Sequence, residues 1–547
     1  MILPRWTEKY SKAESGRDHL AYESVGVSML ERLLPGISNI TMRARYYSFF
    51  PWVIYRFFKS EEPKTYGEFR TYLKTKSLAF LYANGLCHPE ENTGINGIDL
   101  VRSDLDKGAK KEYFWSEKDI DKFKDNFWIY SQKLSQLKIT ADNEESEIES
   151  LTKTRGKELA EAFESSIENT EYFKEYCDKC DSKISTSALK QYGQTGGVMD
   201  LNKFPKEQKM LLETFFRFED IPDEVDDFTR YYIAQTNDGS ARARRESLLL
   251  YLDIINQHKG VFEYDNLRNI QYFSKVNKSL YKPNKKLEHN LEFWRIFQAR
   301  QYFVYAIETI FHAVTLAIDE QPLSLDQIAN NLLDKVDFAS IKKDFGIDIN
   351  KGTTIKEFFQ KISNGKKDEV FDKFFNIDAK INEEKIFRLI RDNFRDKNYN
   401  YFVIYPLIIL GFVYLRFNYY RKNKTHYWEF GKLGGQTNLS MDVFFEFIDR
   451  KIEEKTSIEE FLSVLIRDYI CMQHTFVAIA KLSWYQNDTF HFSYDNGILH
   501  GLRIADANTN APKFWNTLNI LTDLGLITEK EGRYQLTAQG KNILNRI

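Results

Sequence analysis

The C-terminal residues 512–547 carry side chains suited to contacting nucleic acid. A helical pattern begins near Pro512, and its outer face would present Lys513, Asn516, Thr517 and Asn519. A short charged hairpin after this helix would add Lys530 and Arg533. Asparagine and threonine can form hydrogen bonds with base edges, and lysine and arginine can contact backbone phosphates. We therefore predict that these side chains bind nucleic acid.

The order of signals in the same segment predicts a winged helix-turn-helix. Four apolar side chains share one face of the first helix: Phe514, Leu518, Leu521 and Leu524. Gly525 ends that helix, the charged tip 528–532 predicts a two-stranded hairpin, and Thr537 is a typical N-cap for a last helix. Modules of this kind contact DNA or RNA, or dock on other proteins, and the sequence leaves both alternatives open.

Arg467 and His474 form a second candidate site, with catalytic chemistry. They lie seven residues apart, so a regular α-helix would place both side chains on one face. This spacing resembles the Arg-x4–6-His motif of HEPN-type ribonucleases, and the polar Asp468 after the arginine fits that motif. The resemblance implies RNA cleavage without a metal ion. Arg421 and His426, five residues apart, match the same motif, so a chance match is expected and the alternative is an amphipathic helix with a polar seam of paired side chains.

A basic patch is predicted at the start of a helix that covers residues 241–257. The preceding segment 237–240 is typical of a turn and an N-cap, and Arg242, Arg244 and Arg245 follow in the first turns. Cations at a helix N-terminus oppose the helix dipole. An anionic group must therefore lie nearby, either a carboxylate of the protein or a backbone phosphate of a ligand.

Charge, cysteine content and motifs limit the class of protein. Lysine and arginine total 77 and aspartate and glutamate total 79, so nucleic acid would be contacted only through a local patch. Four scattered cysteines are too few for a disulfide framework and favour a reducing cytoplasm. The apolar stretch 401–417 is short for a membrane span, so we expect a buried helix and no membrane contact. The sequence shows no phosphate loop and no metal or nucleophile motif, so we predict no cofactor and no metal ion.

Helical periodicity dominates the chain and predicts a mainly α fold with a small α+β tail. Capping-box pairs, Ser324 with Gln327 and Ser457 with Glu460, predict the starts of two of its helices. We expect five consecutive regions: an aromatic-rich helical domain at 1–100, a charged helical insert at 101–200, a helical domain at 201–340, a helical domain with the buried apolar helix at 341–456, and a helix-hairpin region with the winged helix at 457–547.

Three stretches carry a resemblance to a group of known proteins: 43–47 (Arg-Ala-Arg-Tyr-Tyr), 298–302 (Gln-Ala-Arg-Gln-Tyr) and the tail 512–540. With them the chain resembles uncharacterised proteins of bacterial defence islands, of the Druantia or a similar kind. The resemblance implies a non-enzymatic accessory subunit of a multi-gene antiviral system, in which a partner such as an ATPase or a helicase does the work. The alternative is a ribonuclease effector that uses Arg467 and His474.

Overall fold

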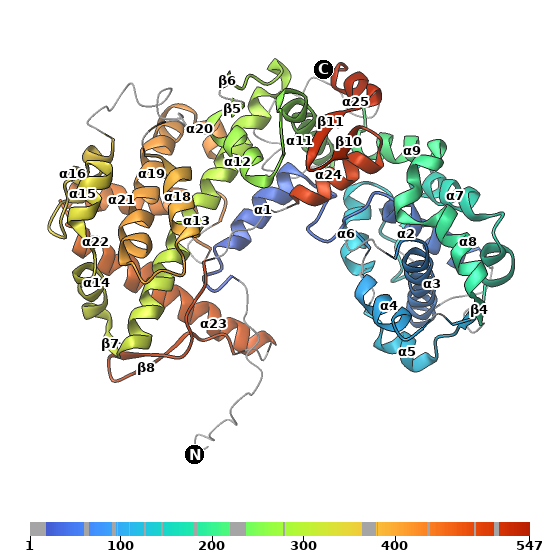
Figure 1. Cartoon of the computed structure of the whole chain (residues 1–547), viewed down its shortest axis with the longest axis horizontal. Coiled ribbons are helices and arrows are strands. Elements are labelled where there is room, and N and C mark those ends of the chain that lie inside the picture. Colours follow the sequence, from blue (N-terminus) through green and yellow to red (C-terminus); the bar gives the residue numbers. More distant parts are fainter. Residues whose placement is uncertain are drawn as a thin grey trace, which may run out of the picture. The chain divides into compact units, whose positions relative to one another are not determined.

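The fold is mainly helical, with only short strands among the described residues. The computed structural model describes residues 18–59, 65–89, 94–95, 97–108, 110–124, 127–143, 146–179, 183–218, 237–276, 279–363, 379, 381–434, 438–485, 488–507 and 513–547. The chain forms two compact units, and each unit joins segments that are distant in sequence (Figure 1). Unit 1 comprises Met1–Leu30, Asp265–Lys282 and Leu291–Asn510, and unit 2 comprises Glu31–Tyr264, Pro283–Asn290 and Ala511–Ile547.

Unit 2 contains the N-terminal helices and the C-terminal tail. Its elements are α2 (Tyr46–Phe57), α3 (Tyr66–Cys87), α4 (Ile98–Leu105), β1 (Glu112–Tyr113), α5 (Glu117–Lys122), α6 (Phe127–Gln136), β2 (Thr140–Ala141), β3 (Ser150–Leu151), α7 (Arg155–Ile167), η1 (Tyr172–Tyr176), β4 (Ile184–Ser185), α8 (Thr186–Gly196), η2 (Val198–Lys203), α9 (Pro205–Phe216), α11 (Asn237–Gln257), η3 (Lys285–Leu287), α24 (Phe514–Asp523), β10 (Ile527–Lys530), β11 (Arg533–Leu536) and α25 (Ala538–Leu544). Its strands form antiparallel pairs, β1 with β4, β2 with β3 and β10 with β11.

Unit 1 contains the middle of the chain. Its elements are β5 (Lys275–Val276), β6 (Ser279–Leu280), β7 (Leu323–Ser324), α14 (Leu325–Asp334), α15 (Phe338–Phe345), α16 (Ile355–Ile362), α18 (Glu383–Asp392), η4 (Asn400–Ile404), α19 (Tyr405–Asn423), α20 (Thr425–Trp428), α21 (Met441–Glu453), α22 (Ile458–Val464), η5 (Leu465–Cys471), α23 (Met472–Tyr485), β8 (Phe492–Asp495) and β9 (Ile498–Gly501). Three further helices contain residues of both units: α1 (Glu23–Leu33), α12 (Tyr264–Phe273) and α13 (Glu288–Glu320). Strand β9 pairs with both β7 and β8 in antiparallel register.

Side-chain caps account for the start of several helices. At α22, the Ser457 hydroxyl accepts the Glu460 amide at 3.2 Å, and the Glu460 carboxylate accepts the Ser457 amide at 2.9 Å. The pair Ser324 and Gln327 caps α14 in the same reciprocal way. Each pair satisfies two amides that the first helical turn leaves without partners. Both predicted capping boxes are therefore confirmed.

Among the described residues, two helices are long and apolar enough to cross a membrane, but both are buried within the fold. They cover Lys285–Glu320 and Asn400–Asn423, and 94 % and 89 % of their most apolar windows are buried. Helix α19 packs against α16, α18, α20 and α21. At Gly411 a Cβ atom would lie only 2.6 Å from the Ile362 side chain of α16, so the close packing requires glycine. The stretch 401–417 therefore forms the expected buried helix.

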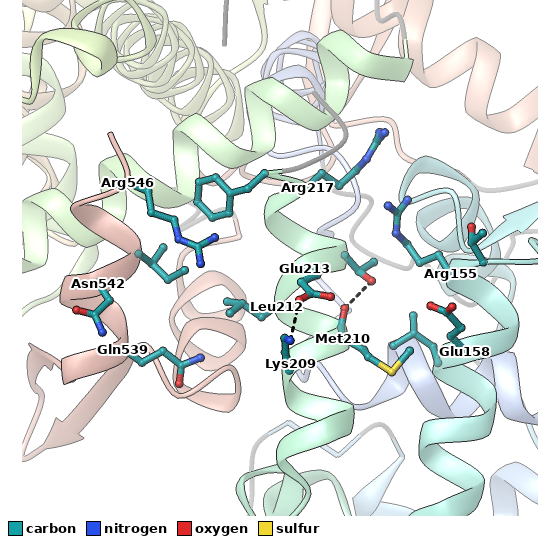
Figure 2. A pocket seen from close by; sticks show the side chains of 15 residues that line it. Arg155, Glu158, Lys209, Met210, Leu212, Glu213, Arg217, Gln539, Asn542 and Arg546 are labelled. Carbon is teal, nitrogen blue, oxygen red and sulfur yellow. Dashed lines mark hydrogen bonds and ion pairs between the residues drawn. The ribbon is translucent and has the colours of Figure 1, made fainter. Parts of the chain in front are cut away.

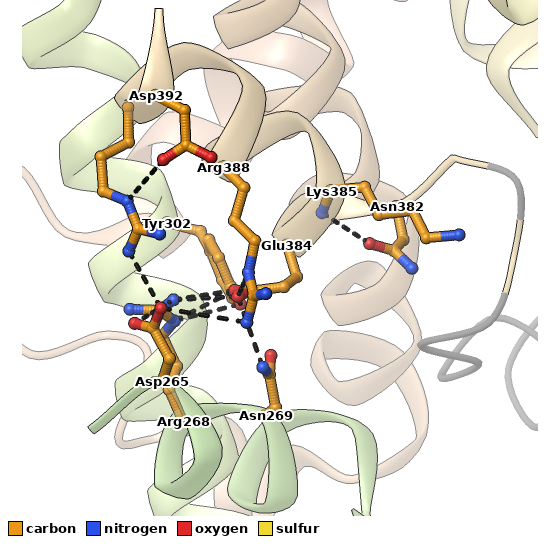
Figure 3. Close-up of polar contacts among 10 residues, drawn as sticks. Asp265, Arg268, Asn269, Tyr302, Asn382, Glu384, Lys385, Arg388 and Asp392 are labelled. Atoms are coloured by element: carbon orange, nitrogen blue, oxygen red, sulfur yellow. Dashed lines mark hydrogen bonds and ion pairs between the residues drawn. The ribbon is translucent and has the colours of Figure 1, made fainter. Parts of the chain in front are cut away.

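Buried carboxylates at the start of α18 organise the charged interior of unit 1. Glu384 accepts hydrogen bonds from Arg268 at 2.9 Å and from the Tyr302 hydroxyl at 2.7 Å (Figure 3). Glu383 accepts from Arg416 at 2.8 Å and from the Tyr272 hydroxyl at 2.7 Å. We call these residues the Glu383–Glu384 network. Both carboxylates and both guanidinium groups are buried, and each charge faces an opposite one.

Candidate anion-binding pocket

The C-terminal segment contains the predicted succession of helix, hairpin and helix. Helix α24 is followed by the β10–β11 hairpin, in which Ile527 pairs with Leu536 and Lys530 with Arg533. The two turn residues, Glu531 and Gly532, both have positive φ angles, 53° and 72°. Positive φ at both positions gives the tight turn that suits the twist of a two-stranded hairpin. The Thr537 hydroxyl then accepts the Gly540 amide at 3.0 Å and caps α25, as predicted.

The polar side chains of α24 do not face outward as predicted. Lys513 is buried, and its Nζ donates to the Leu34 carbonyl at 3.0 Å and lies 2.8 Å from Glu31. Asn516 is buried and donates to the Ser38 carbonyl at 2.7 Å. Thr517 is fully buried and donates to the Lys513 carbonyl at 2.7 Å. The expected outward orientation of these three side chains is wrong, because the second face of α24 is also covered by protein.

Asp523 shows why α24 is enclosed. It lies at the last turn of α24, and its Oδ2 accepts the Arg43 Nε and the Ala44 amide, both at 2.9 Å. The helix is thus held at its C-terminal end by residues 43–44 and at its N-terminal end by Glu31 and Leu34. Burial lowers the pKa of Lys513 to about 8, although Glu31 opposes this shift. Within the tail, Asn519 is half-buried, and Lys530 and Arg533 remain exposed.

Helices α7, α9 and α25 of unit 2 enclose a pocket of about 640 Å³ (Figure 2). Its lining residues are Thr154, Arg155, Glu158, Leu159, Lys209, Met210, Leu212, Glu213, Thr214, Arg217, Phe218, Gln539, Asn542, Ile543 and Arg546. The C-terminal helix therefore supplies one wall, and two helices of the N-terminal half of the chain supply the rest. This volume is typical of sites for small molecules or for one end of a larger ligand.

The lining of the pocket has an excess of positive charge. Its cations are Arg155, Lys209, Arg217 and Arg546, and its carboxylates are Glu158 and Glu213. Four cations against two carboxylates leave a formal excess of two. Glu213 lies 3.7 Å from Lys209 on the exposed side of α9, so it neutralises the lysine more than the arginines. The pocket favours an anion.

The predicted basic patch of α11 lies inside the protein, behind this pocket. Arg242, Arg244 and Arg245 are all buried, so they form no surface patch. Arg242 pairs with Glu246 one turn later, with 2.9 Å between Nε and Oε1, so its anionic neighbour is a carboxylate of the protein, the first of the two alternatives. Arg244 donates instead to the carbonyl oxygens of Phe215, at 2.8 Å, and Pro35, at 3.3 Å. These partners satisfy hydrogen bonds, but carbonyl groups do not neutralise the charge of Arg244.

The charges of two residues that line the pocket also affect the pKa of Arg244. Burial, followed by the charges of Arg217 and Arg155, lowers the pKa of Arg244 to about 9. We call Arg244, Arg217 and Arg155 the Arg244 cluster. Phe218 follows Arg217 in the chain, and the guanidinium groups of Arg245 of α11 and of Arg546, which follows α25, lie 5.6 Å and 4.9 Å from its ring centroid. An anion in the pocket would relieve this accumulation of like charge.

The polar side chains of the pocket can hold an anion. Its described lining residues include no histidine, cysteine or aspartate, and its ionisable groups are arginines, Lys209, Glu158 and Glu213. Among the described residues, no group of three or more His, Cys, Asp or Glu side chains is placed to hold a metal ion. Guanidinium groups beside an aromatic ring and two side-chain amides, from Gln539 and Asn542, can orient a phosphate or carboxylate.

Arg467 and His474 do not share a helix face. Residues Leu465–Cys471 form a π-helix, η5, whose extra residue shifts the phase of the helix between them. Arg467 is exposed and pairs with Asp468, whereas His474 is fully buried. Its Nδ1 hydrogen-bonds to the His19 carbonyl at 3.2 Å, and its Nε2 accepts the His491 amide at 3.0 Å. Burial lowers the pKa of His474 to about 3. Both ring nitrogens are engaged, so the geometry expected for a ribonuclease pair is absent.

No sequence signal indicated the pocket as a whole. Its walls come from residues 154–159, 209–218 and 539–546, which no local spacing connects. Three arginines in α11 indicated a nearby anion, and two of them, Arg244 and Arg245, donate to the carbonyl oxygens of Phe215 and Arg217, next to the pocket. Comparisons of the chain with protein-family models, with curated proteins and with solved structures find no match.

Proposed function

We propose that this protein is a non-enzymatic nucleic-acid-binding subunit, which holds backbone or terminal phosphates in the pocket between α7, α9 and α25. The observation that carries the proposal is the Arg244 cluster. Burial first, and then the nearby charges of Arg217 and Arg155, lower the pKa of Arg244 to about 9, and Arg244 has carbonyl oxygens as its hydrogen-bond acceptors. Such an arrangement is costly without an anion and is stabilised by one.

Phosphate fits this site better than an isolated carboxylate does. Arginine binds phosphate through two parallel N–H donors, and several arginines can share the oxygens of one phosphate. Exposed cations elsewhere in the tail, Lys530 and Arg533 of the hairpin, extend the basic character beyond the pocket. A polymer with repeating phosphates would use both places, which favours nucleic acid over a small anion.

The binding we propose is independent of base sequence. Direct reading of bases requires polar side chains on a helix or strand that enters a groove. Lys513, Asn516 and Thr517 of α24 are buried and bonded within unit 2, so they are unsuited to that role. The tail would then act as a winged helix whose hairpin and last helix contact phosphates, while its first helix packs against residues 31–44.

A place in a bacterial antiviral assembly is the biological setting that we infer from the resemblance of the chain. A cytoplasmic accessory subunit of this kind would hold nucleic acid while a partner ATPase or helicase acts on it. The sequence has no phosphate loop of its own, which agrees with such a division of labour.

The test is an affinity measurement on the full chain at two salt concentrations. Fluorescently labelled single- and double-stranded DNA and RNA oligonucleotides, with and without a 5′-phosphate, serve as probes. We expect the affinity to fall steeply with salt and to be similar for different sequences. The double variant Arg155→Ala/Arg546→Ala should bind about tenfold or more weakly. The slope of log affinity against log salt concentration should become shallower by the amount expected for about two lost phosphate contacts.

Arg467→Ala is the matched control, because Arg467 is an exposed arginine of unit 1 that pairs with its neighbour Asp468. This variant should bind all probes like the wild type. The same samples test the ribonuclease alternative, since His474→Ala and Arg467→Ala should leave the RNA as intact as the wild type does. Wild-type affinity that is insensitive to salt, or unchanged binding by the double variant, would contradict the proposal.

A further inference from the structure

Helix α23 of unit 1 exposes an apolar face. Four of its exposed side chains, which we call the α23 stripe, are Met472 (61 % exposed), Phe476 (57 %), Ile479 (51 %) and Leu482 (38 %). Spacings of three and four residues align them along one face of the helix, and Trp484 (77 %) is exposed further round its last turn. The opposite face, with Val477, Ala478 and His474, is buried within unit 1. A helix with large apolar side chains on its exposed face as well normally lies between two partners, and the described residues of unit 1 cover only one of its faces.

The area of the α23 stripe is comparable with that of the largest apolar patches on monomeric proteins. Large apolar and aromatic side chains present on the order of 200 Å² each, so the four exposed fractions add up to roughly 400 Å². The largest apolar patches of monomeric proteins reach about 300–600 Å² and are often functional. One side of a standard protein–protein interface buries about 800 Å². The stripe alone therefore accounts for about half of one side of a standard dimer interface.

The charges around the stripe favour a second copy of the chain over other partners. Helix α23 contains one cation, Lys481, which donates to the Asp18 carbonyl at 2.8 Å, and no carboxylate. Just before the stripe, Arg467 and Asp468 pair with each other. A helix that binds membranes carries several lysines or arginines along its polar side, and a charged partner would require a charged surface. A neutral apolar stripe is complementary to itself.

We propose that the protein forms a twofold symmetric dimer through antiparallel contact of two α23 helices. Phe476 and Ile479 lie at the middle of the stripe, so they would lie near the symmetry axis. Met472 of each copy would then contact the last turn of the other α23, near Trp484. Antiparallel pairing also aligns the helix dipoles favourably. This inference concerns unit 1 and does not depend on the pocket of unit 2.

The oligomeric state of the full chain tests the proposal. Sedimentation velocity over a roughly hundredfold range of concentration should show a species near twice the 64.7 kDa of one chain. Phe476→Glu should weaken dimerisation by about tenfold or more, because it places a charge at the centre of the interface. Trp128→Glu is the matched control, since Trp128 is also an exposed aromatic residue (71 %) but lies on α6 of unit 2. It should leave the dimer unchanged.

A cross-linking experiment tests the interface without a charged substitution, so that unfolding of Phe476→Glu is not mistaken for loss of the dimer. Ile479→Cys, at the middle of the stripe, should give a disulfide-linked dimer on mild oxidation, whereas Trp128→Cys should give no more than the wild type. The proposal fails if the chain is monomeric throughout, if Phe476→Glu dimerises normally, or if Ile479→Cys does not cross-link. It also fails if a monomeric chain binds phosphatidylcholine vesicles through the stripe, or if dimers form only after residues 1–17 are deleted.

Discussion

Buried arginines in unit 1 and in unit 2 have different kinds of hydrogen-bond acceptor. In the Glu383–Glu384 network of unit 1, Arg268 faces the buried Glu384 carboxylate at 2.9 Å (Figure 3), and Arg416 faces the buried Glu383 carboxylate at 2.8 Å. In the Arg244 cluster of unit 2, Arg244 donates to two carbonyl oxygens and is close to two further arginines. The guanidinium groups of the first group bind charged acceptors, whereas Arg244 binds uncharged acceptors next to the pocket.

The difference separates a structural role from a binding role. Buried charges that neutralise each other specify how α12, α18 and α19 pack, and they leave nothing for a ligand to do. A buried cation such as Arg244, whose hydrogen bonds go to uncharged carbonyl oxygens, destabilises the free protein, and an anionic ligand would offset that cost. The comparison thus supports placing the site of the protein in unit 2, and it predicts different consequences for the loss of one arginine in each group.

Arg416→Met should have the largest effect of any single change in either group. The buried Glu383 carboxylate then keeps its hydrogen bond from the Tyr272 hydroxyl but loses the charge of Arg416, so about 3–5 kcal/mol of unfolding free energy should be lost. Scanning calorimetry would measure this as a lower unfolding temperature. Adding Glu383→Gln removes the orphaned charge, so the double variant should be more stable than the sum of the single losses predicts.

A control for this prediction is Arg391→Met, in the same region of unit 1. The Arg391 side chain is 39 % exposed, and its partner Asp265 also pairs with Arg268 at 2.9 Å. We expect a loss of about 0–1 kcal/mol. Equal losses for Arg391→Met and Arg416→Met would show that burial of the pair is not what stabilises unit 1.

Arg244→Met should destabilise less than Arg416→Met does, although both side chains are fully buried. The change removes hydrogen bonds to the Phe215 and Pro35 carbonyls, which would cost about 1–3 kcal/mol. It also removes repulsion by Arg217 and Arg155, which offsets part of that loss. Urea denaturation measures the unfolding free energy of both variants. A greater loss of unfolding free energy in Arg244→Met than in Arg416→Met would refute the proposed difference between the two groups.

Inorganic phosphate should stabilise unit 2 through the Arg244 cluster. At ten times its dissociation constant, a ligand that binds only the folded state adds about 1.4 kcal/mol. The unfolding temperature should therefore rise with phosphate more than with chloride at equal ionic strength. Arg155→Ala/Arg546→Ala should lose this increment, and Arg416→Met should retain it. If phosphate still raises the unfolding temperature of the double variant, phosphate does not bind in the pocket.

Elements with local signals were predictable from the sequence. Ser457 with Glu460 and Ser324 with Gln327 marked helix starts because capping involves residues three positions apart. The apolar stretch that became α19 and the succession of α24, β10, β11 and α25 followed from periodicity and turn residues in the same way.

Side-chain orientation was not predictable, because it depends on contacts distant in sequence. Lys513 and Asn516 looked like the outer face of a helix, but their partners are Glu31, Leu34 and Ser38, which lie more than 470 positions away. The phase shift of η5 separated Arg467 from His474, and no residue type in that segment signals a π-helix. The pocket forms where three stretches that are distant in sequence meet, so no local pattern could predict it. Only the arginines of α11, which lie next to the pocket, stood out in the sequence.

The smallest predicted effect is a change in stability at acidic pH. It distinguishes arginines that bind carboxylates from arginines that bind carbonyl oxygens. Burial would raise the pKa of Asp265, but Arg268 and Arg391 outweigh it and hold that pKa below the ordinary 3.8. The ionised carboxylate therefore stabilises unit 1 above pH 3.8, and this contribution is lost as the pH falls through the lower pKa of the folded state. Asp265→Asn should cost about 0.5–1 kcal/mol at neutral pH, and its difference from the wild type should vanish in acid. The difference between Arg244→Met and the wild type should stay constant over the same range, because the Phe215 and Pro35 carbonyls do not titrate. Unfolding temperatures of the three proteins at neutral and acidic pH measure both differences, and a parallel response of the two variants would mean that the Arg244 cluster also relies on a carboxylate.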